Sequence, residues 1–285
     1  MRPYTGEQHE VQPTPRGNGS DVTALVNCDE GPVFVKACRN SPGGRRASII
    51  RERLVNPHVR PVSPALQWHA ADDEWIALGF EVIEGRSSDF TPESRDLPDV
   101  VGIIEQIGEL PLPGEADEWR ETRWDRFADE ADAQLFRGET LLFTDVNPDN
   151  LMMGRGRAWA VDWSWPTQGA AFIDPACLVV QLIAAGHTPE SAEYWAGNCK
   201  GWSDAESRAI DAFAAATARM NRAFADRNPD ASWLGAMADA AQAWADHRAP
   251  HPSRAAATAG ARDWGRRWAG RGGSRSSTST PSAKR

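Results

Sequence analysis

Cysteine is scarce in this chain of 285 residues. The four cysteines, at positions 28, 38, 177 and 199, form no Cys-x-x-Cys pair, and no histidine stands at the spacing of a zinc ligand. The sequence therefore gives no support to a zinc module or a disulfide framework. We interpret the four side chains as reduced thiols with structural roles.

Long apolar runs are absent as well. The longest candidate, residues 176–186, is interrupted by Gln181 and falls short of the roughly 18 residues needed to cross a bilayer. The start of the chain, MRPYTGEQHE, lacks the apolar stretch of a signal peptide. We therefore expect a cytoplasmic protein without a membrane partner.

Positive charge is in deficit, because 31 Lys and Arg residues stand against 40 Asp and Glu residues, a net charge of -9. A chain with this balance does not hold nucleic acid or an anionic membrane by broad electrostatic attraction. We therefore expect no nucleic-acid partner, and a small or cationic partner fits better. An apolar fraction of 41% over this length predicts a sizeable core, in one two-lobed domain or two compact ones.

The first part of the chain has the pattern of strands. Two β-like runs flank the turn residues Asp29, Glu30 and Gly31, which predicts a hairpin. Apolar residues at helical spacing predict a helix over residues 47–55 that ends before Pro57. The strands expected here cover residues 22–26, 32–37, 65–68 and 75–83.

The second part is predicted to be mainly helical. A strand pair joined through Gly154, Arg155 and Gly156 interrupts the helices. The helices expected here cover residues 100–110, an acidic stretch over 117–136, and Ala-rich segments from Pro175 to about Trp268, with breaks near Gly201 and Asn228.

These patterns together predict an α+β fold with two lobes. We place a flexible segment at residues 1–15, an N-lobe at 16–84, a C-lobe at 85–270 and a disordered, basic, Ser-rich tail at 271–285. A turn at residues 84–86 and the segment after it would connect the two lobes.

The most informative segment is the polar loop Thr-Asp-Val-Asn-Pro-Asp-Asn at residues 144–150, which Asp162 follows twelve residues later. Asp145 and Asn150 in the loop, with Asp162 at a neighbouring strand end, can place oxygen ligands around Mg²⁺ and leave one carboxylate for a substrate hydroxyl. Phosphoryl transfer requires these parts, together with a cation for the phosphates.

Two other interpretations of this loop arise on these residues alone, and the details of the sequence exclude the first. Asp145, Asn147 and Asp149 alternate as ligands do in a calcium-binding EF-hand, but Asn150 replaces the required glycine and Pro148 interrupts the loop. The loop could also be a turn in which Asp and Asn side chains cap backbone groups.

A candidate cation lies upstream. Lys36 stands on a predicted strand between apolar residues, and Glu52 stands on the helix that follows. Because an unpartnered buried ammonium is costly, Glu52 is the expected partner of Lys36. Taken singly, either residue could equally be a solvated surface charge.

In this order, the features resemble the aminoglycoside phosphotransferase family of protein-kinase-like small-molecule kinases. The resemblance spans residues 17–268, and its most specific part is TDVNPDNLMM followed by AVDWSWPTQGAAFIDPA. It implies a protein-kinase-like two-lobe fold, with a small antiparallel β-sheet N-lobe and a larger, mainly helical C-lobe. The positions that carry it are Gly17, Gly19, Lys36, Glu52, Asp145, Asn150 and Asp162.

The resemblance also implies roles. Asp145 would orient the substrate hydroxyl or accept its proton, and Asn150 and Asp162 would hold Mg²⁺. Lys36 would contact the α- and β-phosphates of ATP or GTP, and Glu52 would fix it in place.

Three further parts of the site follow from the same resemblance. Gly17 and Gly19 would form the phosphate turn, just before the first strand. The nucleotide base would contact the backbone near Glu81 and Ile83, between the lobes. Asp174 would tie its own loop to the catalytic segment.

The sequence departs from the family pattern at several positions. Phe143 stands where the family usually has His, Thr144 where Gly is common and Asn147 where His is frequent. Phe143 and the weak glycine turn motivate the alternative of a nucleotide-binding pseudokinase that transfers no phosphate. A third hypothesis is a helical interaction module with an incidental Asp-Asn turn.

The expected reaction moves the γ-phosphate of a nucleoside triphosphate to a hydroxyl of a small molecule, which could be an aminoglycoside, another antibiotic or a metabolite. Such an activity fits antibiotic resistance or secondary metabolism. The eight acidic residues between positions 115 and 132 could attract a polycationic aminoglycoside or form a solvated face. Trp163 and Trp165 could stack on a sugar or a cationic group, or belong to the core.

Overall fold

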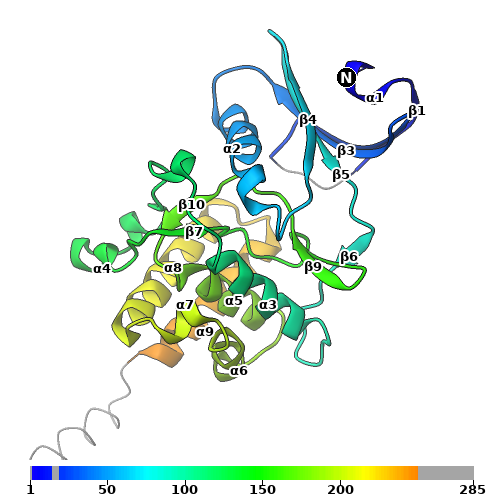
Figure 1. Cartoon of the computed structure of the whole chain (residues 1–285). Coiled ribbons are helices and arrows are strands. Elements are labelled where there is room, and N and C mark those ends of the chain that lie inside the picture. Colours follow the sequence, from blue (N-terminus) through cyan, green and yellow to red (C-terminus); the bar gives the residue numbers. More distant parts are fainter. Residues whose placement is uncertain (1, 15–18, 250–285) are drawn as a thin grey trace, which may run out of the picture. The chain divides into compact units, whose positions relative to one another are not determined.

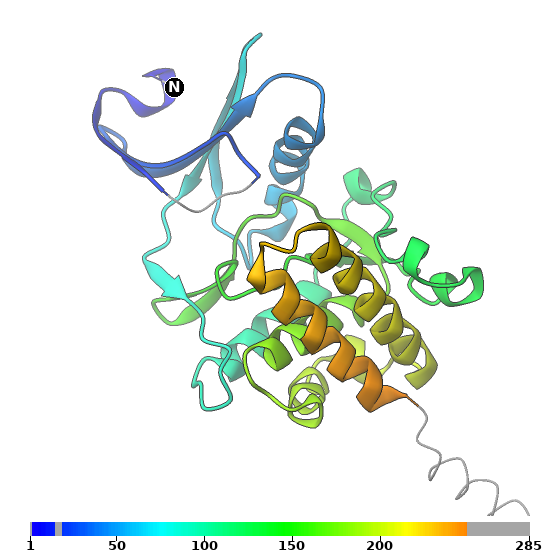
Figure 2. The same ribbon diagram turned by 180° about the vertical axis from the view of Figure 1, so that it is seen from behind.

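The computed structural model describes residues 2–14 and 19–249 (Figure 1). Those up to His247 belong to one compact unit. A five-stranded sheet forms one end of it and a mainly helical part forms the other (Figures 1 and 2). The predicted α+β organisation, with an antiparallel sheet followed by a larger helical part, is confirmed.

The five-stranded sheet has the order β1-β2-β3-β5-β4, and all its neighbouring strands are antiparallel. The predicted hairpin is present, and alternate residues of β2 are buried, as the period of a strand requires. Its strands are β1 Gln8–Pro13, β2 Val22–Cys28, β3 Gly31–Arg39, β4 Leu66–Ala71 and β5 Trp75–Glu81.

The expectation of an unfolded segment at residues 1–15 is wrong for its described part. A short helix, α1 Arg2–Thr5, is followed by β1, which pairs along its length with β2. Every residue of β1 is exposed, so this edge strand shows no apolar alternation and depends on backbone pairing. The glycine turn consequently lies between β1 and β2 and not before the first strand, and Gly17 itself lies outside the described residues.

Helix α2, Gly44–Val59, packs on β3, β4 and β5. Its Ile49 is buried with Leu78 and Phe80 of the sheet. The helix continues past the expected end and contains Pro57, because Val59 is fully buried in the core beyond it. Burial of the last turn here outweighs the backbone hydrogen bond that proline removes.

The helical part is built around one large core cluster. Its elements are α3 Leu97–Gly108, η1 Gly114–Ala116, η2 Asp125–Phe127, α4 Glu130–Gln134, α5 Ile173–Ala184, α6 Pro189–Ala196, α7 Lys200–Ser203, α8 Ser207–Arg227 and α9 Ser232–Arg248. The breaks near Gly201 and Asn228 are both present, because only the four-residue α7 lies between the end of α6 and the start of α8, and α8 ends at Arg227. The helix expected beyond residue 249 and the tail at 271–285 lie outside the described residues.

The long helix expected over residues 117–136 is not formed. The backbone around Glu121 is extended and bonds to Gln168, with Glu121 N donating to Gln168 O over 2.8 Å and Gln168 N to Trp119 O over 2.6 Å. Trp124 is buried against Phe213 of α8. Tertiary contacts thus divide the segment into short turns, although its apolar residues suit a helix.

Two small sheets frame the polar loop. One pairs β7 Thr140–Leu142 with β10 Thr167–Gly169, and the other has the order β6-β8-β9, with β6 Gly85–Ser87, β8 Leu151–Gly154 and β9 Arg157–Ala160. The predicted β8–β9 hairpin is present. The turn expected at residues 84–86 is wrong, because β6 pairs with β8 there.

None of the four cysteines, all of which lie in the described ranges, forms a disulfide, as expected. Among the helices of residues 2–14 and 19–249, none combines the length and apolarity that crossing a membrane requires.

Candidate active site

The polar loop begins at the end of β7 and is anchored by Asp174 at the start of α5. Phe143 N donates to Asp174 Oδ2 over 2.8 Å and Thr144 N donates to Oδ1 over 2.7 Å. Burial raises the pKa of Asp174 to about 6 against the opposing effect of these two hydrogen bonds. Asp174 therefore occupies the structural position that the family resemblance implies.

Hydrogen bonds within the loop orient Asp145 and Asn150. Asn147 Nδ2 donates to Asp145 Oδ1 over 3.1 Å, and Asn150 Nδ2 donates to the backbone oxygen of Asp145 over 3.1 Å. Asn147 Oδ1 accepts from the backbone N of Asp149 and of Asn150, each over 3.0 Å. The loop is thus an Asx turn built on Asn147, and this turn also positions the two predicted functional side chains.

Asp162 follows β9 and has a positive φ of 63°, which turns the chain sharply at this point. Its Oδ1 accepts from Lys36 Nζ over 2.8 Å and from Ser164 Oγ. Burial alone would raise the pKa of Asp162, but the Lys36 ammonium outweighs it and holds the pKa below its ordinary value. Asp162 is therefore ionised at neutral pH.

Lys36 on β3 joins the sheet to this loop. Its Nζ donates to Glu52 Oε1 on α2 over 2.8 Å, so the predicted Lys36–Glu52 pair is present, and both side chains are buried. Burial lowers the pKa of Lys36, but Glu52 and Asp162 outweigh this effect and raise it overall. The ammonium thus stays charged between two carboxylates.

Asp145 is exposed to solvent near Asp162. The surrounding protein and then the charge of Asp162 raise the pKa of Asp145 above its ordinary value. A cation bound between the Asp145 and Asp162 carboxylates would relieve their mutual repulsion.

The residues present fit Mg²⁺. The described residues contain no cluster of three or more His, Cys, Asp or Glu side chains that could hold a metal. The candidate donors are instead the ionised Asp162 carboxylate and the Asn150 amide oxygen, whose NH₂ group faces the loop. Carboxylate and amide oxygens are donors that Mg²⁺ accepts, and substrate phosphates commonly complete its coordination.

The residues predicted to contact the nucleotide lie at two different places. A Cβ atom on Gly19 would lie 3.9 Å from Ser164 Oγ, so the described end of the glycine turn is close to the Asp162 network. Glu81 ends β5, where its N donates to Ala65 O over 2.9 Å, and Ile83 follows it, half-buried, before β6. Within the described residues, no hydrogen bond or ion pair joins Glu81 or Ile83 to Lys36, Glu52 or Asp162.

The aromatic residues near Asp162 have different environments. Trp163 is buried, donates from Nε1 to Ala160 O over 3.1 Å and packs against Phe143 at 4.8 Å between ring centroids. Trp163 therefore belongs to the core, and Phe143 fills the position of the family histidine by packing. Trp165 is 46% exposed and lies 5.2 Å from the guanidinium of Arg51.

Sequence reasoning missed the structural roles of Asn147 and Ser164. Both are short polar side chains two residues from an aspartate, a spacing at which side chains commonly bond to the neighbouring turn. This spacing is the feature of the sequence from which the two roles could have been predicted.

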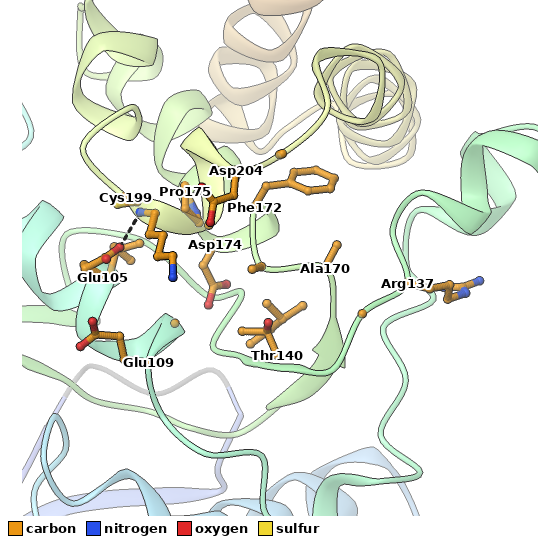
Figure 3. Close-up of a pocket in the computed structure, with 18 residues that line it drawn as sticks. Glu105, Glu109, Arg137, Thr140, Ala170, Phe172, Asp174, Pro175, Cys199 and Asp204 are labelled. Carbon is orange, nitrogen blue, oxygen red and sulfur yellow. Dashed lines mark hydrogen bonds between the residues drawn. The ribbon is translucent and has the colours of Figure 1, made fainter.

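A separate cavity of about 740 Å³ lies between α3, β7, α5 and α7, where Asp174, Glu105, Glu109 and Thr140 are among its lining residues (Figure 3). None of the predicted catalytic, metal or phosphate-contacting residues lines it. Asp174 therefore faces this cavity and also holds the start of the polar loop.

No protein-family model and no curated protein matches the sequence. Solved structures match along most of the chain. The choline kinase LicA from Streptococcus pneumoniae is 12% identical with a TM-score of 0.59, over 85% of this chain and 95% of LicA. An aminoglycoside phosphotransferase from Alicyclobacillus acidocaldarius is 13% identical with a TM-score of 0.57, over 86% of this chain and 92% of that one.

A structure of LicA in complex with AMP also matches, with 11% identity and a TM-score of 0.56 over 84% of this chain and 92% of LicA. At these identities the likeness concerns the fold. The chain has the protein-kinase-like two-lobe fold that choline kinases and aminoglycoside phosphotransferases share.

Proposed function

We propose that this protein is a phosphotransferase that moves the γ-phosphate of ATP or GTP to a hydroxyl of a small molecule. The observation that carries the proposal is the convergence of Lys36, Glu52 and Asp162 beside the Asp145–Asn150 loop. These residues come from β3, α2 and the ends of two small sheets, and the fold brings them together as phosphoryl transfer requires.

In the proposed reaction, the acceptor hydroxyl donates a hydrogen bond to Asp145. Its oxygen forms a bond to the γ-phosphorus while the bond from that phosphorus to the β–γ bridging oxygen breaks, and the hydroxyl proton passes to Asp145 and then to water. The raised pKa of Asp145 makes it a better proton acceptor than an ordinary aspartate. The products are a phosphate ester and a nucleoside diphosphate.

The other residues position the nucleotide. Lys36 would direct its ammonium to the α- and β-phosphates, with Glu52 holding the side chain. Asn150 and Asp162 would hold Mg²⁺, which neutralises phosphate charge when bound. In this proposal residues 16–84 bind the nucleotide, with its base near Glu81 and Ile83, and the part of the C-lobe from residue 85 onward binds the acceptor.

The pseudokinase alternative has no observation in its favour. Phe143, which motivated it, is buried against Trp163 and its backbone N is held by Asp174. The catalytic loop is therefore formed without the family histidine. A cytoplasmic location and a role in antibiotic resistance stay predictions.

The first experiment is a thermal-shift titration of the full chain with ATP and GTP, each with and without Mg²⁺. We expect the nucleotide with Mg²⁺ to raise the melting temperature, because a ligand that binds only the folded state stabilises it. Transfer of label from the γ-position to an acceptor panel then tests the reaction. No shift with either nucleotide, and no transfer, would support the interaction-module hypothesis instead.

The metal site is tested by Asp162→Ala. We expect the Mg²⁺-dependent part of the thermal shift to disappear, because the ionised ligand is removed. Ser164→Ala is the matched control, since it removes only one hydrogen bond to Asp162 and should retain most of the shift. An unchanged Mg²⁺ response in Asp162→Ala would place the metal elsewhere.

A further inference from the structure

The segment between α3 and β7 brings a charge pair to the base of the catalytic loop. Glu121 is anchored to β10, because Thr167 Oγ1 donates to Glu121 Oε2 over 2.9 Å. Thr167 pairs with Leu142 of β7, three residues before Asp145. Figure 1 shows this segment beside β7 and β10 and next to α2, which contacts η1.

Glu121 holds Arg123 in one orientation. Arg123 Nε donates to both carboxylate oxygens over 3.1 Å, Nη2 donates to Oε2 over 2.7 Å, and the backbone N of Arg123 donates to Oε1 over 2.7 Å. The Glu121 side chain is 1% exposed, whereas that of Arg123 is 46% exposed. A buried carboxylate thus pre-organises an accessible guanidinium.

The guanidinium keeps donors for a ligand. Within the described residues its side-chain hydrogen bonds use Nε and Nη2, which leaves Nη1 to a group outside the protein. The Glu121 carboxylate that holds this guanidinium bonds to Thr167, which pairs with Leu142, three residues before Asp145. Arg123 is therefore held at the end of β7 from which the Asp145 loop begins.

A second guanidinium adds positive charge on the same side. Arg51 of α2 lies between Trp119 and Trp165, 5.2 Å from each ring. Burial lowers the pKa of Arg51, and the negative charge of Glu121 opposes this effect. The Glu121 carboxylate thus interacts electrostatically with both Arg51 and Arg123.

The acidic residues of this segment are largely used within the protein. Asp125 bonds to Arg137 and Asp132 to Arg208, and a Glu115 oxygen lies 3.5 Å from His58 Nε2. Asp129 caps α4 by accepting from Asp132 N over 2.9 Å. These contacts offset part of the negative charge that a polycationic acceptor would meet at this segment.

We propose that the acceptor carries an oxyanion, a carboxylate or a phosphate, which Arg123 binds while the acceptor hydroxyl faces Asp145. Glu121 is then a positioning residue for this contact. The proposal rests on the proposed function above and specifies its substrate class. It predicts a hydroxylated acid or a phosphorylated polyol as acceptor, in preference to a neutral polyol or an aminoglycoside.

The test compares acceptors that differ at one group. The first set has similar six-carbon chains: gluconate carries a carboxylate, sorbitol 6-phosphate a phosphate, and sorbitol only neutral hydroxyls. L-homoserine and its amide form a second matched pair. Kanamycin is the polycation. Thermal shift in the presence of nucleotide and Mg²⁺ measures binding, and label transfer measures KM and kcat.

We expect one of the anionic compounds to bind and to be phosphorylated, with a KM at least on the order of tenfold below that of its neutral counterpart, as a charge-assisted contact provides. The carboxylate and phosphate arms show which oxyanion is preferred. Equal or better use of the neutral compounds or of kanamycin overturns the proposal.

Three variants assign the effect to Arg123. Arg123→Gln should raise the KM of the anionic acceptor on the order of tenfold and leave the KM of the nucleotide unchanged. Arg123→Lys keeps the charge and should retain part of the affinity. Arg126→Gln, on the same segment and stacked on Phe127, is the charge-matched control and should behave as the parent protein. A change in the nucleotide KM in place of the acceptor KM contradicts the proposal.

The Arg123→Gln variant leaves the buried Glu121 carboxylate without its guanidinium partner, which lowers the stability of the folded protein. The double variant Glu121→Gln/Arg123→Gln removes both charges and keeps a side chain that can bond Thr167, so it provides a second test of the same KM change. If no compound is phosphorylated, the proposed phosphotransferase function fails, and the thermal-shift measurement then tests the anion site by itself. An anion that stabilises the parent protein but not the double variant supports an anion site at Arg123. If no anion behaves in this way, the anion-site proposal is overturned.

Discussion

Asp145 is the side chain on which the proposed chemistry depends most directly. It lies in an Asx turn, bonded to Asn147 and Asn150, and its carboxylate is exposed to solvent where a hydroxyl could reach it. The loop geometry therefore keeps the Asp145 carboxylate outside the Lys36 network, in which Glu52 and Asp162 already form ion pairs with Lys36.

Asp145→Asn tests this assignment. We expect the rate of transfer to fall by at least about 100-fold, because the variant keeps the size of the side chain but accepts no proton. The affinity for the Mg²⁺-nucleotide should change little. Asp149→Asn removes a charge from the same loop and serves as the control. Full activity of Asp145→Asn would show that another group interacts with the hydroxyl.

Asp174 has a different function, since it is buried and bonds to the backbone N of Phe143 and Thr144. Its pKa in the folded protein is about 6, above the ordinary value of 3.8. Between these pH values the folded protein holds a proton that the unfolded chain releases. The stabilising contribution of this carboxyl is therefore complete below pH 3.8 and decreases as the pH rises to about 6.

Urea unfolding of the parent protein and of Asp174→Asn at several pH values measures this effect. As the pH rises from about 4 to 6, the free energy of unfolding of the parent protein should fall relative to that of Asp174→Asn. At neutral pH the variant should nevertheless be less stable by about 1–3 kcal/mol, because an amide satisfies the two backbone donors poorly. A difference that grows in favour of the parent protein over this pH window would contradict the raised pKa.

Among the structural elements, the two loops that carry Asp145 and Asp162 begin in a similar way. Each follows a short strand with a residue in the left-handed region, Thr144 at φ 61° after β7 and Asp162 at φ 63° after β9. For a β-branched residue such as threonine this conformation is strained. The strain is retained where the backbone must turn into the candidate site.

Comparison of Thr144→Gly with Thr144→Ala measures this strain. Both variants lose the bond from Thr144 Oγ1 to Phe143 O, so they differ mainly in their tolerance of positive φ. We expect the glycine variant to have the higher free energy of unfolding, by about 1 kcal/mol. Equal stability of the two variants in urea would indicate that the turn is not strained.

The elements also show where sequence patterns succeed. The β2–β3 hairpin, α2 and the β8–β9 hairpin were predictable because their apolar spacing and turn residues are local signals. The exposed strand β1 and the extended segment around Glu121 were not, since backbone bonds to β2 and to Gln168 decide their conformations. Such bonds leave no periodic trace in the sequence.

For the molecule as a whole, Lys36 links the five-stranded sheet to the helical part. Its Nζ bonds to Glu52 within the N-lobe and to Asp162 in the C-lobe, 126 residues away in sequence. Because Lys36 and Glu52 are buried, loss of one partner leaves a charge that water does not solvate.

Lys36→Met should therefore lower the free energy of unfolding by about 3–5 kcal/mol. Lys36→Met/Glu52→Met removes both buried charges and should recover a large part of this loss. Urea unfolding of the parent protein, both single variants and the double variant gives the coupling between the two residues. Additive losses would show that the pair contributes no coupling energy, contrary to its geometry.

The sequence by itself was sufficient to identify the chemical groups of the candidate site and the two-part fold. Asp145 and Asn150 share one short loop, Asp162 follows closely, and Lys36 lies within an apolar run, so local spacing carries this information. The same spacing could not distinguish an Asx turn from a catalytic loop, and the structure shows that the turn itself orients Asp145.

Only the tertiary structure decided which distant charges meet. The bond between Thr167 and Glu121 spans 46 residues, and it ties the Glu121–Arg123 pair to β10, next to the strand β7 that leads into the polar loop. The physical reason is that a buried charge takes whichever partner the packed chain brings within hydrogen-bonding distance. Sequence patterns report neighbours within a few residues, whereas the charge balance of an acceptor site depends on contacts made through the whole fold.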